Sequence, residues 1–175
     1  MRKIIAIILP VLLLATCNLP HSIPATVTTT ANSHNCYLNW ASQPLPDLSR
    51  HVQAAINAAR LKDVGANAQA YGENCYDSQT NKPVSFSTLE TDFYITVKVA
   101  NLTDQTNMGN LLERILVVLD TFPAGKIPGP QPGSISVSFR GGSQELNLTF
   151  TVTAGKSARL QGLHDAALFE KLQNK

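Results

Sequence analysis

The residues that could do metal or nucleophilic chemistry are few and far apart in this chain. The four histidines are His21, His34, His51 and His164, and no two of them lie within helical spacing. Neither a CxxC pair nor an HExxH pattern occurs, so the sequence predicts no metal site and no bound cofactor. There is also no GxSxG elbow, which leaves a serine hydrolase of that class without support.

Cys75 is a candidate nucleophile, because a cysteine thiolate is strongly nucleophilic. Cys75 could form a thiol–imidazole pair with His51 or His164. Glu73 and Glu90 are carboxylates in the same part of the sequence. Together these residues define one functional hypothesis, a small exported, hydrolase-like enzyme with a site near Glu73, Cys75 and Glu90.

The N-terminus has the pattern of a targeting segment. Arg2 and Lys3 precede an apolar run over residues 4–15, which matches the charged and hydrophobic regions of a signal peptide. The run is shorter than the roughly 20 residues that span a bilayer. A buried helix of the domain is the alternative, and Pro10 argues against it. The sequence therefore predicts a signal peptide over residues 1–16.

The end of this run, Leu14-Ala15-Thr16-Cys17, resembles the lipobox of bacterial lipoproteins. In that family the cysteine becomes the first residue of the mature chain and carries the lipid, which includes palmitate-type acyl chains. Thr16 departs from the pattern, because Gly, Ala or Ser usually precedes the cysteine. The resemblance implies lipid attachment at Cys17 and an exported protein held on the outward side of the cell membrane. The alternative is ordinary secretion, with Cys17 incidental.

The three cysteines are Cys17, Cys36 and Cys75. If Cys17 carries lipid, an even pair remains in an oxidising compartment, where disulfides persist. We therefore expect a disulfide between Cys36 and Cys75. Two separate thiols are the alternative that the sequence leaves open.

Residues 17–45 are rich in Thr, Ser, Asn, Ala and Pro and show little apolar periodicity. Such a composition buries too little apolar surface to offset the entropy of ordering. We expect a flexible linker after the lipid-attachment cysteine, reaching on the order of 30 Å as a coil. Tyr37 and Trp40 are exceptions, which we expect to pack onto the domain beside Cys36.

The charge balance excludes one class of partner. The chain has 14 Lys and Arg against 12 Asp and Glu, a formal charge of +2. Arg2 and Lys3 account for that excess, so the rest of the chain is neutral. A neutral body without a basic cluster lacks the electrostatic footprint of a nucleic-acid-binding protein.

Residues 46–175 have the periodicities of a single α+β domain. Ala66, Ala68 and Ala70 alternate with polar residues, which indicates a strand, although alanine is a poor strand former and a helix is the alternative. Gly141-Gly142 separates two alternating runs, a hairpin signal. The expected elements are a helix over about 47–60, a strand over 64–76, a strand ending near 100, a helix over 104–122, a loop over 123–133, strands over 135–139 and 146–152, and a helix over 156–172. Gly162 is a candidate break in that last helix.

This order, α-β-β-α-β-β-α, favours a two-layer sandwich. Two hairpins joined by a helix suit a mostly antiparallel sheet of about four strands with helices on one face. We expect ferredoxin-like character. The strand order cannot be inferred from the sequence.

The strands also present a second, polar side. If helices cover the apolar side, the outward positions form a face rich in hydroxyl and amide groups and nearly free of charge. An ordinary exposed sheet, rich in Thr because of its strand propensity, is the alternative. The candidate binding face consists of Tyr94, Thr96, Ser136, Ser138, Asn147 and Thr149.

These observations favour a membrane-anchored, extracytoplasmic lipoprotein that acts by binding rather than by catalysis. Its expected contacts are the membrane, through the lipid, and a protein, peptide or glycan on the polar face. The enzyme centred on Cys75 is the rival hypothesis, and the redox state of Cys75 discriminates between them.

Overall fold

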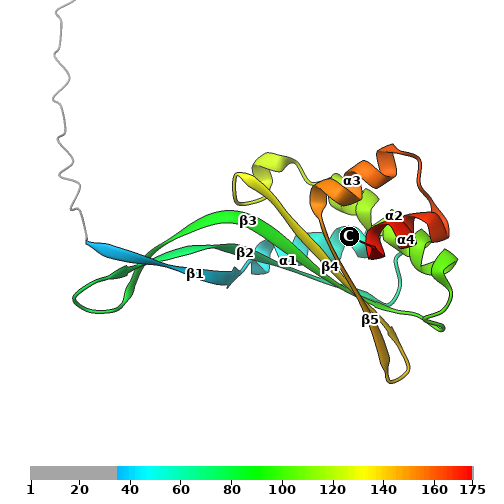
Figure 1. Cartoon of the computed structure of the whole chain (residues 1–175), viewed down its shortest axis with the longest axis horizontal. Coiled ribbons are helices and arrows are strands. Elements are labelled where there is room, and N and C mark those ends of the chain that lie inside the picture. The colour runs from blue at the N-terminus through cyan, green and yellow to red at the C-terminus, as the bar shows by residue number, and fades with distance from the viewer. Residues whose placement is uncertain (1–34, 175) are drawn as a thin grey trace, which may run out of the picture. The chain divides into compact units, whose positions relative to one another are not determined.

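The structure, a computed structural model, describes residues 35–174 (Figure 1). The predicted signal peptide and Cys17 lie outside the described residues. The strands are β1 (Cys36–Pro44), β2 (Val64–Asp77), β3 (Pro83–Lys98), β4 (Gln131–Gly141) and β5 (Gln144–Thr151). The helices are α1 (Pro46–Ala58), α2 (Gln105–Asp120), α3 (Val152–Leu160) and α4 (Asp165–Gln173), with a short 3-10 turn, η1 (Ala124–Lys126).

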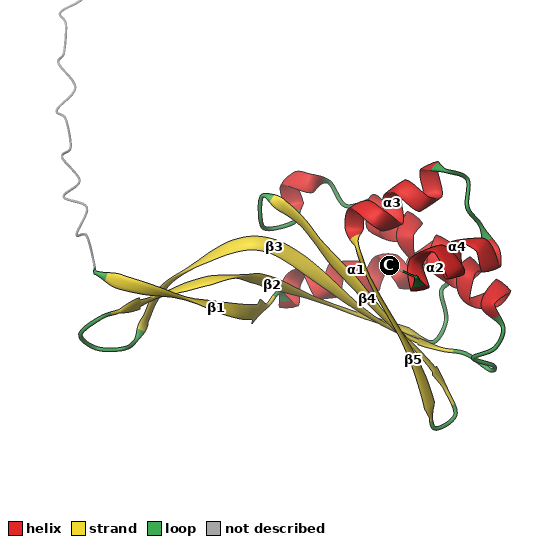
Figure 2. Cartoon of the chain, viewed as in Figure 1, coloured by secondary structure: helices red, strands yellow, loops and turns green. Residues whose placement is uncertain are grey.

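The five strands form one mixed sheet in the order β1-β2-β3-β4-β5 (Figure 2). β3 and β4 run parallel, and the other neighbours are antiparallel. A parallel pair cannot be joined by a tight turn. α2 and the proline-rich loop after it therefore form the crossover between β3 and β4.

The expected α+β class, with helices against one side of the sheet, is confirmed. The expected sheet was wrong in detail, since it has five strands rather than four and a parallel pair at its centre. The strands also follow the sequence order, so a ferredoxin-like description fits only roughly. Periodicity identifies which segments are strands, but it carries no information about which strands pair.

The additional strand, β1, lies in the segment expected to be linker. Its residues pair with β2 without interruption from Cys36 opposite Asp77 to Pro44 opposite Gln69. The predicted linker over 17–45 is therefore wrong for residues 36–44, and residues 17–34 lie outside the described part. A polar composition disfavours a core, but it does not prevent an edge strand from forming backbone hydrogen bonds.

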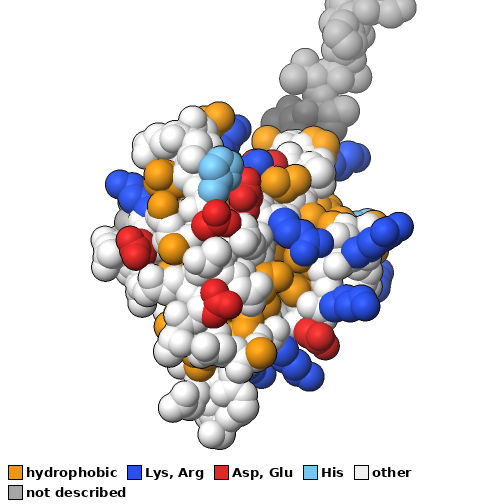
Figure 3. Space-filling view, turned by 90° about the vertical axis from the view of Figure 1, so that its right-hand side faces the viewer, with side chains coloured by type: hydrophobic (Ala, Val, Ile, Leu, Met, Phe, Trp, Pro, Cys, Tyr) orange, Lys and Arg blue, Asp and Glu red, His pale blue; other side chains and the backbone are white. Residues whose placement is uncertain are grey.

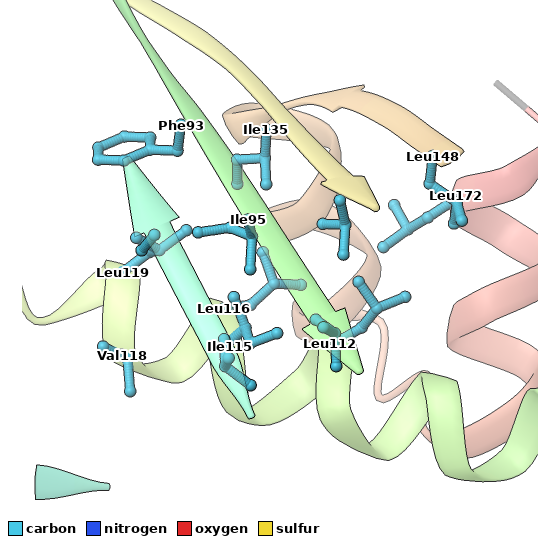
Figure 4. Packing of buried hydrophobic residues seen from close by; sticks show 14 of the residues in the cluster. Phe93, Ile95, Leu112, Ile115, Leu116, Val118, Leu119, Ile135, Leu148 and Leu172 are labelled. Atoms are coloured by element: carbon cyan, nitrogen blue, oxygen red, sulfur yellow. The ribbon is translucent and has the colours of Figure 1, made fainter. Parts of the chain in front are cut away.

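The core lies between the sheet and the helices, with β3 and α2 at its centre (Figure 4). Phe93 and Ile95 on β3 and Ile115 on α2 belong to one hydrophobic cluster, and all three side chains are almost fully buried. Each such side chain contributes about 1.5–3 kcal/mol relative to an exposed position. The same alternation continues in β4 and β5, where the buried residues are Ile135, Val137, Phe139, Leu148 and Phe150.

The helix ends follow local chemistry that the sequence displays. The Asp104 carboxylate caps α2 by accepting a hydrogen bond from the backbone N–H of Asn107 at 2.9 Å. The Thr151 hydroxyl caps α3 in the same way, accepting from Ala154 N–H. Gly162, at a φ of 72°, separates α3 from α4, which confirms the expected break.

β2 is a strand, so the helical alternative for its alanine-rich half is wrong. The small side chains of Ala66 and Ala68 allow α1 to approach the sheet closely, and its side chains then bind the β2 edge. Ser49 Oγ accepts from Ala68 N–H at 2.9 Å, and Gln53 Oε1 accepts from Ala66 N–H at 2.8 Å. Gln53 also donates from Nε2 to the Val64 carbonyl at 3.0 Å. α1 therefore replaces a neighbouring strand along this part of the edge.

Beyond α1 the sheet continues as a three-stranded ribbon that projects past the helices (Figure 1). We call this ribbon the arm; it comprises residues 36–44, 70–77 and 83–89. A disulfide between Cys36 and Cys75 joins its first two strands, with a Cα–Cα distance of 5.4 Å. The expected disulfide is confirmed, and it holds an element that has no helix packed against it.

Because the arm lacks a core of its own, the disulfide should contribute strongly to stability. The bond closes a loop with a sequence separation of 39, for which the chain-entropy model gives about 4 kcal/mol. We expect the double variant Cys36→Ser/Cys75→Ser to lose about that much free energy of unfolding, measured by urea titration. Dithiothreitol should lower the stability of the native protein similarly and leave the double variant unchanged. Equal midpoints for the oxidised and reduced native protein would contradict this role.

Candidate functional site

The polar side chains of the central strands form a face that no helix covers, which we call the open face. Tyr94, Ser136 and Thr149 lie side by side on β3, β4 and β5. The next row is Thr96, Ser138 and Asn147. These are the six residues predicted from the sequence, and together they line one open depression of about 310 Å³.

The hydroxyl groups of the depression retain much of their hydrogen-bonding capacity. Ser136 Oγ lies 3.1 Å from Thr149 Oγ1, which pairs these two hydroxyls with each other. Ser138 Oγ is shielded from solvent and has no hydrogen-bond partner at normal geometry. A hydroxyl can donate one hydrogen bond and accept two. The surface therefore offers donors and acceptors together, without a fixed charge in either row.

Tyr94 adds an aromatic ring to this surface. Its side chain is 39% exposed. Partial burial, and secondarily the Asp92 carboxylate, raises the pKa of the Tyr94 phenol above its ordinary value of 10.0. The phenol is therefore neutral at physiological pH and can both donate and accept a hydrogen bond.

Charged residues border the open face at one end. Lys98, Arg140 and Glu145 form the row after Thr96, and Arg140 Nε donates to Glu145 Oε2 at 3.0 Å. The pKa of Glu145 lies below its ordinary value, chiefly because of the Ser138 hydroxyl and then the Asn147 amide, with a smaller effect of Arg140. Since Ser138 and Asn147 make no well-formed hydrogen bond to the carboxylate, their dipoles stabilise it from nearby.

The open face continues from Thr96 into a second hollow, which is basic. This pocket has a volume of about 780 Å³, and its cationic side chains are Arg60, Lys62 and Lys98. Asp63 is the acidic residue in its lining. None of the three cations forms an ion pair within residues 35–174.

The helix-bearing end of the molecule has a different character. Figure 3 shows acidic and basic side chains distributed over it together with small apolar patches. Two ion pairs lie there, Arg159 with Asp120 and His164 with Glu113, the latter at 3.0 Å. Such a mixed, exposed surface is typical of a solvated helical layer.

The arm is a candidate surface that the sequence did not predict. Three of the four tyrosines and the only tryptophan lie on it. Trp40 stacks on Tyr71 on the side of the open face, with ring centroids 5.4 Å apart, and Tyr37 stacks on Tyr76 at the same distance on the other side. Aromatic side chains next to Cys36, within a stretch of Thr, Ser and Asn, were the available signal. These aromatic residues indicated an ordered element, whereas the overall composition of the segment indicated a linker.

The residues of the enzyme hypothesis also lie in or beside the arm. Glu73 and Cys75 share one side of β2, and Glu90 lies opposite Tyr71 on the same side. Cys75 is bonded to Cys36, so its sulfur is not a thiol nucleophile. The histidines expected to partner it lie elsewhere, His51 on α1 and His164 beside Glu113.

The part of the chain that the structure describes contains no cluster of three or more His, Cys, Asp or Glu side chains placed to hold a metal. Within the same residues, no helix is both long enough and apolar enough to cross a membrane.

Two further hollows, of about 560 and 490 Å³, flank the proline-rich crossover loop and share Phe122 in their lining. The lining of the first includes Asp47, His51 and Lys126, and that of the second includes Asp120 and Lys156.

The lowered pKa of Glu145 makes a prediction about stability and pH. A carboxyl group whose pKa is lowered by folding stabilises the protein above its ordinary pKa, here 4.5, and that stabilisation is lost as pH falls through the lowered value. We therefore expect Glu145→Gln to destabilise the protein at pH 7 and to have a smaller effect at a pH well below 4.5. Urea unfolding of both proteins at the two pH values measures the difference. A difference independent of pH would show that the fold does not favour the carboxylate.

Comparison with known proteins adds no family to this description. No protein-family model matches the chain, and neither curated protein sequences nor solved structures give a significant match. The geometry of the open face and the N-terminal sequence pattern are therefore the features from which a function can be inferred.

Proposed function

We propose that this chain is an exported, lipid-anchored domain that binds its ligand on the open face. The observation that carries the proposal is the meeting of all six predicted polar residues in one depression on an uncovered sheet surface. Charged residues are found mostly on the exposed surfaces of proteins. Two adjacent rows of this face carry none.

The chemistry of these rows fits a glycan better than a peptide. Sugar hydroxyls both donate and accept hydrogen bonds, as do the Ser136 and Thr149 hydroxyls and the Asn147 amide group. An extended peptide would instead require a free strand edge for its backbone groups, and the six residues present their side chains on the face of the sheet rather than along an edge. The basic pocket beside Lys98 favours an anionic substituent on the sugar at that end.

A binding role is proposed over the enzyme because the proposed nucleophile is occupied. The Cys36–Cys75 disulfide leaves Glu73 and Glu90 without the thiol on which that hypothesis depended. Two carboxylates on one sheet side can still perform acid–base chemistry, so hydrolysis of the bound glycan is an outcome that the binding experiment below can detect.

The anchor in this proposal is the lipid on Cys17, implied by the resemblance of Leu14 to Cys17 to a lipobox. The first residue of β1 is Cys36, so 18 residues separate the lipid from the sheet. Attachment at the arm places the open face within reach of ligands just outside the membrane.

The anchor predicts a specific mature N-terminus. Mass spectrometry of the protein purified from membranes should find Cys17 as the first residue, with a mass increase equal to a diacylglyceryl group and, in some bacteria, a further acyl chain. Cys17→Ser should remove this mass and release the protein from the membrane fraction or block its processing. An unmodified chain that begins at another residue would exclude the lipid anchor and leave ordinary secretion.

The open face predicts which substitutions abolish binding. We expect Ser136→Lys and Thr149→Lys each to prevent capture of cell-envelope glycan by the immobilised protein, because a long cation would fill the depression and break the hydroxyl pair. Ser157→Lys, at an exposed position on α3, is the matched control and should bind like the native protein. Circular dichroism and urea unfolding establish that each variant is folded.

Treatment of the envelope material distinguishes the ligand classes. Periodate, which cleaves sugars with vicinal hydroxyls, should abolish capture, and proteinase K should not. The reverse result would make the ligand a protein or peptide. Capture that is identical for the two open-face variants and the control would refute the open face as the site. Shortening of the glycan during incubation would favour the enzyme.

A further inference from the structure

A second candidate surface is the outer edge of β1, which no other element of residues 35–174 covers. The backbone N–H of Leu45 donates to the carbonyl of Ala68, opposite it in the ladder, at 3.0 Å. In an antiparallel pair, residues whose backbone groups face the partner alternate with residues whose groups face away. The N–H and C=O groups of Leu38, Trp40 and Ser42 therefore point outward from the sheet.

These outward groups have no hydrogen-bond partner among the described residues. The edge of β2 differs from the edge of β1. Where β2 extends beyond β1, its backbone groups are bound by the side chains of Ser49 and Gln53 from α1. The molecule thus covers one segment of the edge with side chains and leaves the adjoining segment, β1, open. Leu38 and Trp40, in that open segment, are 59% and 56% exposed.

β1 also lacks the features by which proteins protect an edge strand. Charged side chains, bulges, internal prolines and very short strands all discourage pairing with another chain. The nine residues of β1, Cys36–Pro44, include no charged residue, and its ladder with β2 has no register shift. Its one proline, Pro44, is the last residue of the strand.

The opposite edge of the arm is protected in the ways that β1 is not. Residues 83–88 of β3 form a shorter free edge that begins at Pro83. The ladder between β2 and β3 is interrupted by two irregularities within the arm, at Tyr71/Gly72 and at Cys75/Tyr76. β5, the other outer strand of the sheet, carries the charged Glu145. β1 is therefore the regular, uncharged edge of this sheet.

We infer that β1 pairs with β1 of a second copy of this chain, antiparallel and about a two-fold axis, to give one continuous sheet. A two-fold arrangement uses the same strand in both copies and closes at the dimer, whereas pairing between different edges would extend into fibres. Because β1 has no charge, its copy meets no like-charge repulsion. A charged partner strand would gain no ion pair from β1, which favours self-pairing.

The arm is built so that such pairing costs little. The disulfide already holds β1 in its extended position against β2, so little conformational entropy remains to be lost on association. The arm projects beyond the helices (Figure 1), so a second copy can approach the edge without meeting the helical layer. Trp and Tyr side chains, the residues most enriched at protein interfaces, stand on both sides of the arm at Trp40 and Tyr37.

The test uses sedimentation equilibrium of the processed, exported protein, in a density-matched detergent if it carries lipid. We expect a reversible monomer–dimer equilibrium. Trp40 is the only tryptophan, so its emission should shift to the blue over the same concentration range as the dimer forms. Monomers at all concentrations, with a constant emission maximum, would overturn the inference, as would higher oligomers without a dimer.

Two edge variants separate strand pairing from other association. Ser42→Pro removes one outward N–H from each copy and leaves the bonds to β2 intact, so dimer affinity should fall about tenfold or more. Asn39→Lys adds facing like charges at the middle of β1 and should weaken the dimer similarly. Asn110→Lys, exposed on α2, is the matched control and should dimerise like the native protein.

All three variants should keep the native urea-unfolding midpoint to within a small shift. If folded edge variants dimerise as tightly as the control, the interface does not involve β1 and the inference fails. The open-face substitutions leave β1 unchanged, so failure of ligand binding and failure of dimerisation are separate results.

Discussion

The structure depends on the packing of β3 against α2. Phe93, Ile95 and Val97 lie on one side of the central strand and contact the buried stripe of α2. Because successive side chains of a strand point to opposite sides, burying these residues forces Tyr94, Thr96 and Lys98 to the other side. The neighbours β4 and β5 are held in register with β3, so they present their own polar residues in the same rows. The open face is thus a direct consequence of the core.

The free edges of the sheet are the second constraint on this structure. An edge strand has a neighbour on one side only, so it exposes backbone donors and acceptors that need a partner or water. α1 supplies Ser49 and Gln53 to the end of β2, which is possible because Ala66 and Ala68 let the helix come close. No such cover exists on the arm, where a disulfide and two aromatic pairs hold the strands together instead. The arm is therefore stable as a surface without being part of the core.

The distribution of charge separates the surfaces of the molecule. The helical end carries both signs, and the ion pairs there are exposed and contribute little to stability. The central rows of the open face carry none. Its charged row, with Lys98, Arg140 and Glu145, lies at one end beside the basic pocket, and Asp92 lies in the row before Tyr94 at the other end. Selectivity of the open face thus depends on hydroxyl and amide geometry at its centre and on positive charge at its margin.

The count of cysteines led us to expect the Cys36–Cys75 disulfide but left two separate thiols open. The sequence by itself determined most elements of residues 46–175 and the two-sided character of the central strands. These features are local, because the 2.0 and 3.6 residue periods act over short distances in the chain. The six residues of the open face followed from alternation alone. Only the tertiary structure decided the strand order, the parallel pairing of β3 with β4 and the role of residues 36–44 as an edge strand. Those outcomes arise from hydrogen bonds between segments distant in sequence, and a strand's composition does not specify its partner. The Thr- and Ser-rich composition around β1 resembled a linker because its strand buries almost nothing, and that lack of burial is what leaves its edge open.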